Sequence, residues 1–321
     1  MSSKNDTLSV ALAQISPVWL NKNKTLQKIE ATIEQAGKKN CELIAFGEAL
    51  LPGYPHWIAY TNGAEWNSPV QKELHAHYIR NSVEIENGDL DNICHLAKKF
   101  NIAVYLGIIE RAKNRGNHSL YCSLVYINEE GNIQSVHRKL QPTYDERLTW
   151  APGDGNGLRV HKLKEFTVGG LNCWENWMPL PRAALYGMGE NLHVAVWPGS
   201  DHNTRDITRF IARESRSYVL SVSAFMKSSD LPDQTPHLDK ILVSAPDILS
   251  NGGSCIAGPD GDWIVEPVIG SEELIIQTLD VNRVYEERQN FDPSGHYSRP
   301  DVTKLTVNRD RQSVIDIDND E

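Results

Sequence analysis

The sequence predicts an α/β fold with mixed sheets. Strand-like apolar runs alternate with amphipathic helical runs along most of the chain, which is the pattern of α/β proteins. Several strand-like runs carry apolar residues on both faces, as expected for strands that lie between two layers. Turn-forming residues at 130–132 and 259–262 join neighbouring strands as hairpins, so antiparallel pairs are expected beside parallel ones.

The first half of the chain opens with a strand, a helix and a second strand. The strand Leu8–Ile15 precedes an amphipathic helix from Asn23 to Lys39, and the strand Leu43–Phe46 ends at Gly47-Glu48. Two helices, a strand and a hairpin are predicted next, at Ser68–Arg80, Leu90–Phe100, Ala103–Ile109, and Ser119–Ile127 paired with Asn132–Lys139.

The second half continues the alternation on both sides of Cys173. A buried strand precedes this cysteine, and a helix with proline in its first turn follows at Pro179–Tyr186. A strand, a helix, a strand and a hairpin complete the series, at His193–Trp197, Ile207–Ser217, Val219–Ala224 and around Pro259–Asp262. Because no Pro/Gly/Ser-rich linker interrupts the series, we expect one domain over residues 1–303 and a polar, disordered tail over residues 304–321.

Composition and charge describe an ordinary globular protein with a small partner. The 321 residues are 40% hydrophobic and 23% charged, and the net charge of -10 argues against a nucleic-acid or anionic membrane surface as partner. The five cysteines form no C-x-x-C pair, which predicts a reducing compartment. The polar N-terminus lacks a signal-peptide core and no apolar stretch is long enough to span a bilayer, so the predicted location is the cytoplasm.

Cys173 is a candidate nucleophile. It lies at a glycine-rich corner between the strand-like run that contains Gly169-Gly170 and the helix-like run that follows. A thiol at a helix N-terminus is expected to have a lowered pKa, and the free backbone N–H groups there can hold an oxyanion. The alternative is that Cys173 is a small buried hydrophobe, which is the commoner fate of an intracellular cysteine.

Glu48 and Lys139 are candidate partners for this thiol. Each closes a strand-like run, and α/β sheets place their sites at the carboxyl ends of strands. A thiolate requires a base to take its proton and a cation or N–H donors to hold the charge of the attacked substrate. Taken singly, either residue is more often a solvated surface charge, so the catalytic interpretation depends on the trio with Cys173.

Four motifs occur in order along the chain. They are Phe46-Gly47-Glu48-Ala49 with Pro52-Gly53-Tyr54-Pro55, then His137-Arg138-Lys139-Leu140 with Pro142-Thr143 and Glu146-Arg147, then Cys173-Trp174-Glu175-Asn176, and finally Gly295-His296-Tyr297-Ser298-Arg299-Pro300-Asp301. With these motifs the chain resembles the carbon–nitrogen hydrolase (nitrilase) superfamily over about residues 8–303. Tryptophan directly after the cysteine is typical of its nitrilase branch.

The resemblance implies a four-layer α-β-β-α sandwich and a catalytic triad of Glu48, Lys139 and Cys173, with Glu146 as a second active-site carboxylate. It also implies hydrolysis of a nitrile through a covalent thioimidate and thioester, and assembly into a homo-oligomer. For Glu146 the alternative is a surface ion pair with Arg147 or another neighbour. For the whole protein the alternatives are an amide or carbamoyl hydrolase on the same triad, and a non-catalytic scaffold.

Aromatic residues near these motifs are candidate walls of the substrate pocket. Tyr54 and Trp177 are the two we expect to touch substrate, together with Trp174 beside the nucleophile. The other aromatic candidates are Trp57, Trp150 and Trp197. The sequence does not separate aliphatic, aromatic, arylacetonitrile and cyanide substrates. No histidine pair has metal-ligand spacing and no phosphate-binding loop is present, so we expect neither a metal nor another cofactor.

Overall fold

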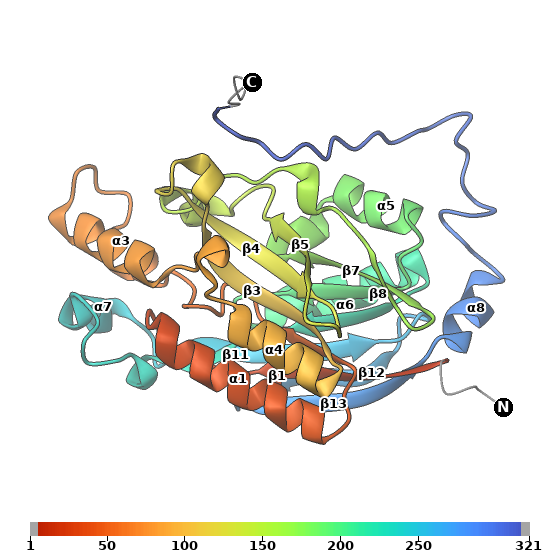
Figure 1. Ribbon diagram of the computed structural model, residues 1–321, viewed down its shortest axis with the longest axis horizontal. Helices are drawn as coiled ribbons and strands as arrows, with labels where there is room; N and C mark the ends of the chain where they lie inside the picture. Colours follow the sequence, from red (N-terminus) through yellow and green to blue (C-terminus); the bar gives the residue numbers. More distant parts are fainter. Residues whose placement is uncertain (1–5, 316–321) are drawn as a thin grey trace, which may run out of the picture.

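A computed structural model describes residues 6–315 (Figure 1). Its strands are β1 (Thr7–Gln14), β2 (Leu43–Phe46), β3 (Ala103–Arg111), β4 (Leu120–Ile127), β5 (Ile133–Arg138), β6 (His161–Leu163), β7 (Phe166–Asn172), β8 (Leu192–Val196), β9 (Tyr218–Val222), β10 (Phe225–Lys227), β11 (Ile248–Ala257), β12 (Trp263–Ile269) and β13 (Glu273–Asp280). Its α-helices are α1 (Lys22–Lys38), α2 (Trp57–Tyr60), α3 (Pro69–Asn81), α4 (Asp91–Phe100), α5 (Pro179–Gly187), α6 (Asp201–Ser215), α7 (Leu238–Ser244) and α8 (Asn282–Arg288).

The strands form two mixed sheets. The first has the order β13-β1-β2-β3-β4-β5, in which β1, β2 and β3 run parallel and the outer strands are antiparallel. The second has the order β10-β11-β9-β8-β7-β6, with β12 also paired to β11. In it β7, β8 and β9 are parallel, whereas β6, β11 and β12 pair antiparallel. The predicted mixed character is therefore confirmed in both sheets.

The sheets stack face to face, and helices cover their outer faces. Alternation along β1 shows the arrangement, because Val10 and Leu12 belong to the apolar cluster that both sheets share, together with Val194 of β8. The intervening Ala11 joins a second cluster that contains Ile29 of α1 and residues of α4. Helix α6 covers the other sheet in the same way. The layers are thus helix, sheet, sheet and helix, as predicted (Figure 1).

The sequence missed some elements of this frame. Strand β13, which pairs with β1 along its whole length, was not expected, and neither were α2, β10 and α7. Helix α6 begins at Asp201, six residues before the expected Ile207, because its first turns present mostly polar residues and lack the apolar periodicity that marks a helix in sequence.

After α8 the chain forms turns at residues 293–297 and 300–302 and then runs extended across the molecule (Figure 1). Within its described part, Arg311 pairs with Asp154 at 2.9 Å and donates to the backbone oxygen of Val136 at 2.6 Å. Residues 304–315 of the predicted tail therefore have specific contacts with the domain, and residues 316–321 lie outside the described range. Among residues 6–315, no helix has both the length and the apolar character needed to cross a membrane.

Candidate active site

Four buried side chains converge where three strands end. Glu48 follows β2, Lys139 follows β5, and Cys173 follows β7, so the first two come from one sheet and the third from the other. Glu146 comes from a short 3₁₀ helix, η3 (Tyr144–Leu148). All four residues are at most 3% exposed. The structure therefore brings together every residue that the sequence predicted as catalytic.

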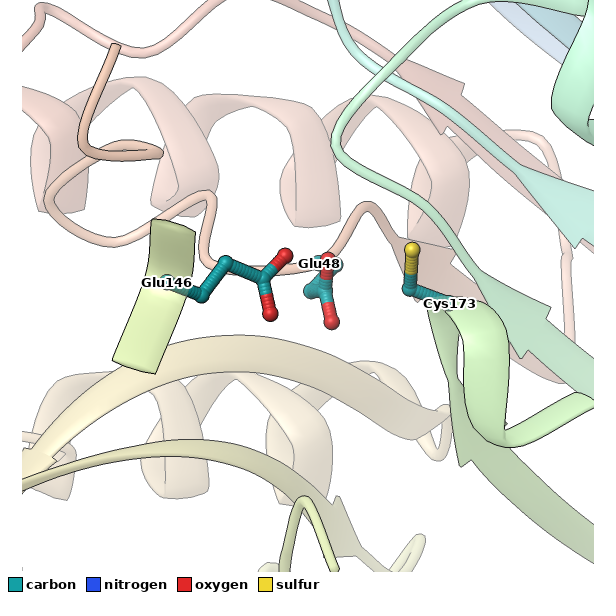
Figure 2. A group of neighbouring side chains, drawn as sticks. All are labelled: Glu48, Glu146 and Cys173. Atoms are coloured by element: carbon teal, nitrogen blue, oxygen red, sulfur yellow. The ribbon is translucent and has the colours of Figure 1, made fainter. Parts of the chain in front are cut away.

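Glu48, Glu146 and Cys173 form a compact cluster. One ligand atom from each, a carboxylate oxygen or the Cys173 Sγ, lies within 4.8 Å of the others. In Figure 2 Glu48 lies between Glu146 and Cys173, so it is placed to exchange a proton with the thiol. The backbone of Glu48 is held by its own N–H, which donates to the Trp197 carbonyl at 3.1 Å. Strand β3 passes close behind, where a Cβ on Gly107 would lie 2.2 Å from the Gly47 oxygen, so only glycine fits there.

Lys139 contacts both carboxylates. Its Nζ is 2.9 Å from Glu48 Oε1 and 2.7 Å from Glu146 Oε2. The backbone N–H of Lys139 donates to the Cys122 carbonyl at 2.8 Å. Burial disfavours the charge on Lys139, but Glu48, Cys173 and Glu146 outweigh it and raise its pKa well above the usual value. The side chain is therefore a permanent buried cation at neutral pH.

Glu146 is held toward Lys139 rather than toward solvent. Its carboxylate accepts from the Thr143 N–H at 2.6 Å in a capping box and from the Tyr54 hydroxyl at 3.1 Å. The alternative of a surface ion pair with Arg147 is not what the structure shows, because the Arg147 Nε donates to the Pro142 carbonyl instead.

Glu48 has the protonation behaviour of a general base. Burial raises its pKa, Lys139 lowers it and Glu146 raises it, which leaves the value at about 7. Its Oε1 accepts from Lys139 and from the Cys122 thiol, which is 3.5 Å away. Its Oε2 is buried and has no hydrogen-bond partner among residues 6–315. One carboxylate oxygen is therefore held in place while the other remains able to accept a proton.

Cys173 is the first residue of a 3₁₀ helix, η5 (Cys173–Trp177), and has a φ of 45°. A left-handed backbone is uncommon for a residue other than glycine and is often found at functional sites. The pKa of the thiol is raised well above its usual value, by burial and by Glu48 and Glu146, although Lys139 and the Trp174 N–H oppose this. The lowered pKa expected from the sequence is thus wrong, because burial and neighbouring carboxylates outweigh the helix terminus.

The aromatic candidates divide between the site and other places. Tyr54 contacts Glu146, and its ring packs edge-on against Trp150 with centroids 5.6 Å apart, while the Lys139 ammonium lies 5.6 Å from the Trp150 ring centre. Trp57 and Trp197 are core residues.

The side chains of Trp174 and Trp177 are 53% and 47% exposed, so neither is buried with the four converging residues. Side chains three residues apart on a 3₁₀ helix share a face, so η5 buries Cys173 with Asn176 and exposes the two tryptophans. Trp174 acts on the site through its backbone N–H, which lowers the pKa of the Cys173 thiol.

A small cavity lies beside Glu48. It has a volume of about 10 Å³ and its walls include Tyr54, His56, Met226 and Ser250. Burial lowers the pKa of His56 to about 4, so this wall is uncharged at neutral pH. A space of this size holds about one water molecule.

Some residues at the site were missed by sequence reasoning. Cys122 donates to Glu48, and the buried pair of His137 and Glu175 lies between the lysine and cysteine segments. The signal available for Glu175 was the Asn-x-x-Glu spacing of a capping box starting at Asn172. Nothing in the sequence indicated the Cys122 contact, because it depends on strand packing.

A cation at the two carboxylates is supplied by the chain itself. The Glu48, Glu146 and Cys173 group is the one cluster of potential metal ligands found within residues 6–315. The Lys139 ammonium contacts both of its carboxylates and compensates their charge, so these donors fit proton transfer better than metal binding.

Comparisons with known proteins agree with this geometry. Residues 9–289 match the model of the carbon-nitrogen hydrolase family. The chain is 36% identical to Nitrilase 2 of an unknown prokaryotic organism, over 98% of this chain and 96% of the relative. It is 34% identical to an arylacetonitrilase from Aspergillus kawachii, over 93% and 91% of the two chains, and 31% identical to an aliphatic nitrilase from Rhodococcus rhodochrous, over 96% and 85%.

The fold has solved counterparts. The crystal structure of a carbon-nitrogen hydrolase from Helicobacter pylori G27 superimposes with a TM-score of 0.69 at 19% identity, and the match covers 92% of this chain and 96% of that one. This match shows the fold, and the family match and the nitrilase relatives show that the chain belongs to the nitrilase branch of the carbon-nitrogen hydrolase family.

Proposed function

We propose that the protein hydrolyses a nitrile to the carboxylic acid and ammonia, with Cys173 as the nucleophile. The observation that carries the proposal is the cluster in which Cys173 Sγ and carboxylate oxygens of Glu48 and Glu146 lie within 4.8 Å, with Lys139 bonded to both acids. The relatives named nitrilase, at 31–36% identity, support the same substrate class.

The first step forms a thioimidate. The raised pKa keeps the Cys173 thiol protonated at rest, so Glu48 must take its proton as sulfur adds to the nitrile carbon. One C–N π bond breaks, and the proton that Glu48 received moves to the nitrile nitrogen. A base with a pKa of about 7 is well matched to both transfers.

Two waters complete the reaction. The first adds to the thioimidate carbon, and Glu48 takes one of its protons and passes it to the nitrogen. A tetrahedral carbon that carries OH, NH₂ and sulfur results. The hydroxyl proton then moves to nitrogen, ammonia leaves, and a thioester remains. The second water attacks this carbonyl, and the Cys173 thiolate leaves and recovers its proton. The cavity beside Glu48, with room for about one water, supports this role for the base.

Negative charge in these steps is stabilised by Lys139 and by the Trp174 N–H. The ammonium contacts Glu48 and Glu146, and the Trp174 N–H lowers the pKa of the Cys173 thiol, so it favours negative charge there. Donors of this kind typically stabilise a transition state by about 3 to 4 kcal/mol each. Because such donors act on the charged intermediates, their loss is expected to lower turnover more than substrate binding.

The experiment that tests the proposal measures ammonia, acid and amide from the purified protein with aliphatic, aromatic and arylacetonitriles and the matching amides. We expect acid and ammonia from at least one class of nitrile, and none from the Cys173→Ala variant. Activity on amides alone would replace the proposal by amide hydrolysis, and a fully active Cys173→Ala variant would refute it.

We also propose that the protein is a homo-oligomer and works in the cytoplasm. Large apolar side chains, Trp174, Trp177, Leu180 and Phe210, are each about half or more exposed on η5, α5 and α6. Exposed apolar groups of this size are typical of surfaces that another chain covers. Light scattering should give at least twice the mass of one chain, and a monomer at micromolar concentration would contradict the proposal.

A further inference from the structure

The Glu175 carboxylate connects the segment that carries Lys139 to the segment that carries Cys173. Glu175 is 1% exposed. Its Oε1 accepts from the Leu140 N–H at 2.7 Å, and its Oε2 accepts from the Asn172 N–H at 2.9 Å. The two donors are the residue after the lysine and the residue before the cysteine.

His137 adds a third connection. Its Nε2 lies 3.1 Å from each Glu175 oxygen, and the ring is almost fully buried. Residues on both sides of Lys139 are therefore held by one carboxylate. Burial alone would raise the pKa of Glu175. The opposite effect of His137 and of the Leu140 and Asn172 N–H groups is larger, so the pKa lies below its usual value. The carboxyl group therefore stays ionised.

The two segments need such a connection because they belong to different sheets. Lys139 ends β5 in the first sheet, and Cys173 ends β7 in the second, and no ladder of strand hydrogen bonds joins β5 to β7 among the described residues. The cysteine also has a left-handed backbone, a conformation that persists only where its surroundings hold it. Apolar packing between sheets fixes a distance less sharply than directional hydrogen bonds.

We propose that Glu175 is a positioning residue that sets the distance between the Lys139 ammonium and the Cys173 thiol. It acts through Asn172, Leu140 and His137 and takes no part in the proton transfers of the mechanism. The inference rests on the proposed function, in which Lys139 and Cys173 must act on the same atoms.

The test compares Glu175→Gln with a matched variant, Glu110→Gln. In the Glu175→Gln variant, one carboxylate oxygen becomes an NH₂ group, which faces the N–H of Leu140 or Asn172 and cannot accept from it. One connection between the two segments is therefore lost. Glu110 is also buried, and it binds Arg138, the neighbour of Lys139, at 2.6 Å, but it joins strands within one sheet and does not reach the cysteine. Both variants therefore remove a buried carboxylate near Lys139.

We expect Glu175→Gln to lower kcat about 100-fold with KM changed less than about threefold, since a misplacement of about 1 Å between reacting groups has an effect of this size. Glu110→Gln is expected to lower the melting temperature but to keep kcat within about threefold. A Glu175→Gln kcat within threefold of wild type, or an equal loss of kcat in both variants, would overturn the inference.

A second variant decides the matter if Glu175→Gln does not fold. His137→Phe removes one connection and leaves both backbone hydrogen bonds, so we expect a smaller loss of kcat, about three- to tenfold, again with KM unchanged. No loss of kcat would overturn the inference. Cys173→Ala, measured in parallel, separates the two proposals: its activity refutes the proposed function, whereas full activity of the Glu175 and His137 variants refutes only the positioning role.

Discussion

Replacing Lys139 by glutamine removes the cation that lies between Glu48 and Glu146. In the native site Lys139 Nζ is 2.9 Å from one carboxylate and 2.7 Å from the other, and all three side chains are at most 2% exposed. Glutamine has a similar length, so the change removes charge and donors while opening little space. Two buried carboxylates then face each other without compensation.

The expected magnitude follows from this burial. Breaking a buried ion pair by removing one partner typically costs about 3 to 5 kcal/mol of unfolding free energy. Loss of one charged donor lowers turnover by about 10² to 10³, and here the proton balance of Glu48 is disturbed as well, so kcat should fall by at least about 10³. Lys139 lowers the pKa of Glu48, so without the cation this pKa rises further in the folded state. The folded variant then binds more protons than the unfolded chain, and its stability increases as pH falls toward about 5.

The assay is urea unfolding at two pH values together with ammonia release from a nitrile that the wild type hydrolyses. Lys164→Gln is the matched control, because Lys164 pairs with Glu42 at 2.8 Å but with side chains 19% and 30% exposed. We expect that variant to lose no more than about 1 kcal/mol and no turnover. If Lys139→Gln behaved like Lys164→Gln, or kept its turnover within about tenfold of wild type, the Lys139 cation would not have the role assigned to it.

Three further outcomes follow from the site. The pKa of Glu48 is about 7 and its ionised form is the base, so kcat/KM should fall as pH decreases through about 7. If kcat/KM fell only below a pH of about 4.5, this assignment would be contradicted. Cys122→Ala removes a donor to Glu48, so initial rates should show this fall in kcat/KM shifted to higher pH; a downward shift would show that the thiol does not donate. Tyr54→Phe removes the hydroxyl that donates to Glu146 at 3.1 Å, and calorimetry should find a loss of about 1 kcal/mol; unchanged stability and kcat would remove Tyr54 from the site.

The residues of the candidate site could be predicted from the sequence in two ways. Glu48, Lys139 and Cys173 each follow a strand-like run, whereas Glu146 was implied by the resemblance to the nitrilase superfamily. Most of the frame was also predictable, since apolar periodicity marks strands such as β2 and helices such as α1.

What the sequence could not predict depends on contacts between segments that lie far apart in the chain. Strand β13 is identified by its pairing with β1. The Cys122 thiol of β4 donates to Glu48, which follows β2, although β3 lies between these two strands in the sheet. The orientation of Trp177 depends on η5 being a 3₁₀ helix, which spacing in sequence does not distinguish from an α-helix. The raised pKa of Cys173 likewise comes from burial and from a carboxylate 125 positions away.

Covalent attachment of substrate to Cys173 tests the central claim most directly. Wild-type protein is mixed with a nitrile that it hydrolyses, quenched with acid during turnover and digested. The mass of the peptide that contains Cys173 is then measured by mass spectrometry. We expect this peptide to gain the mass of the acyl or imidoyl group, and no other cysteine peptide to do so. Turnover with the substrate attached at a different residue, or undiminished turnover by Cys173→Ala that forms no adduct, would contradict the central claim.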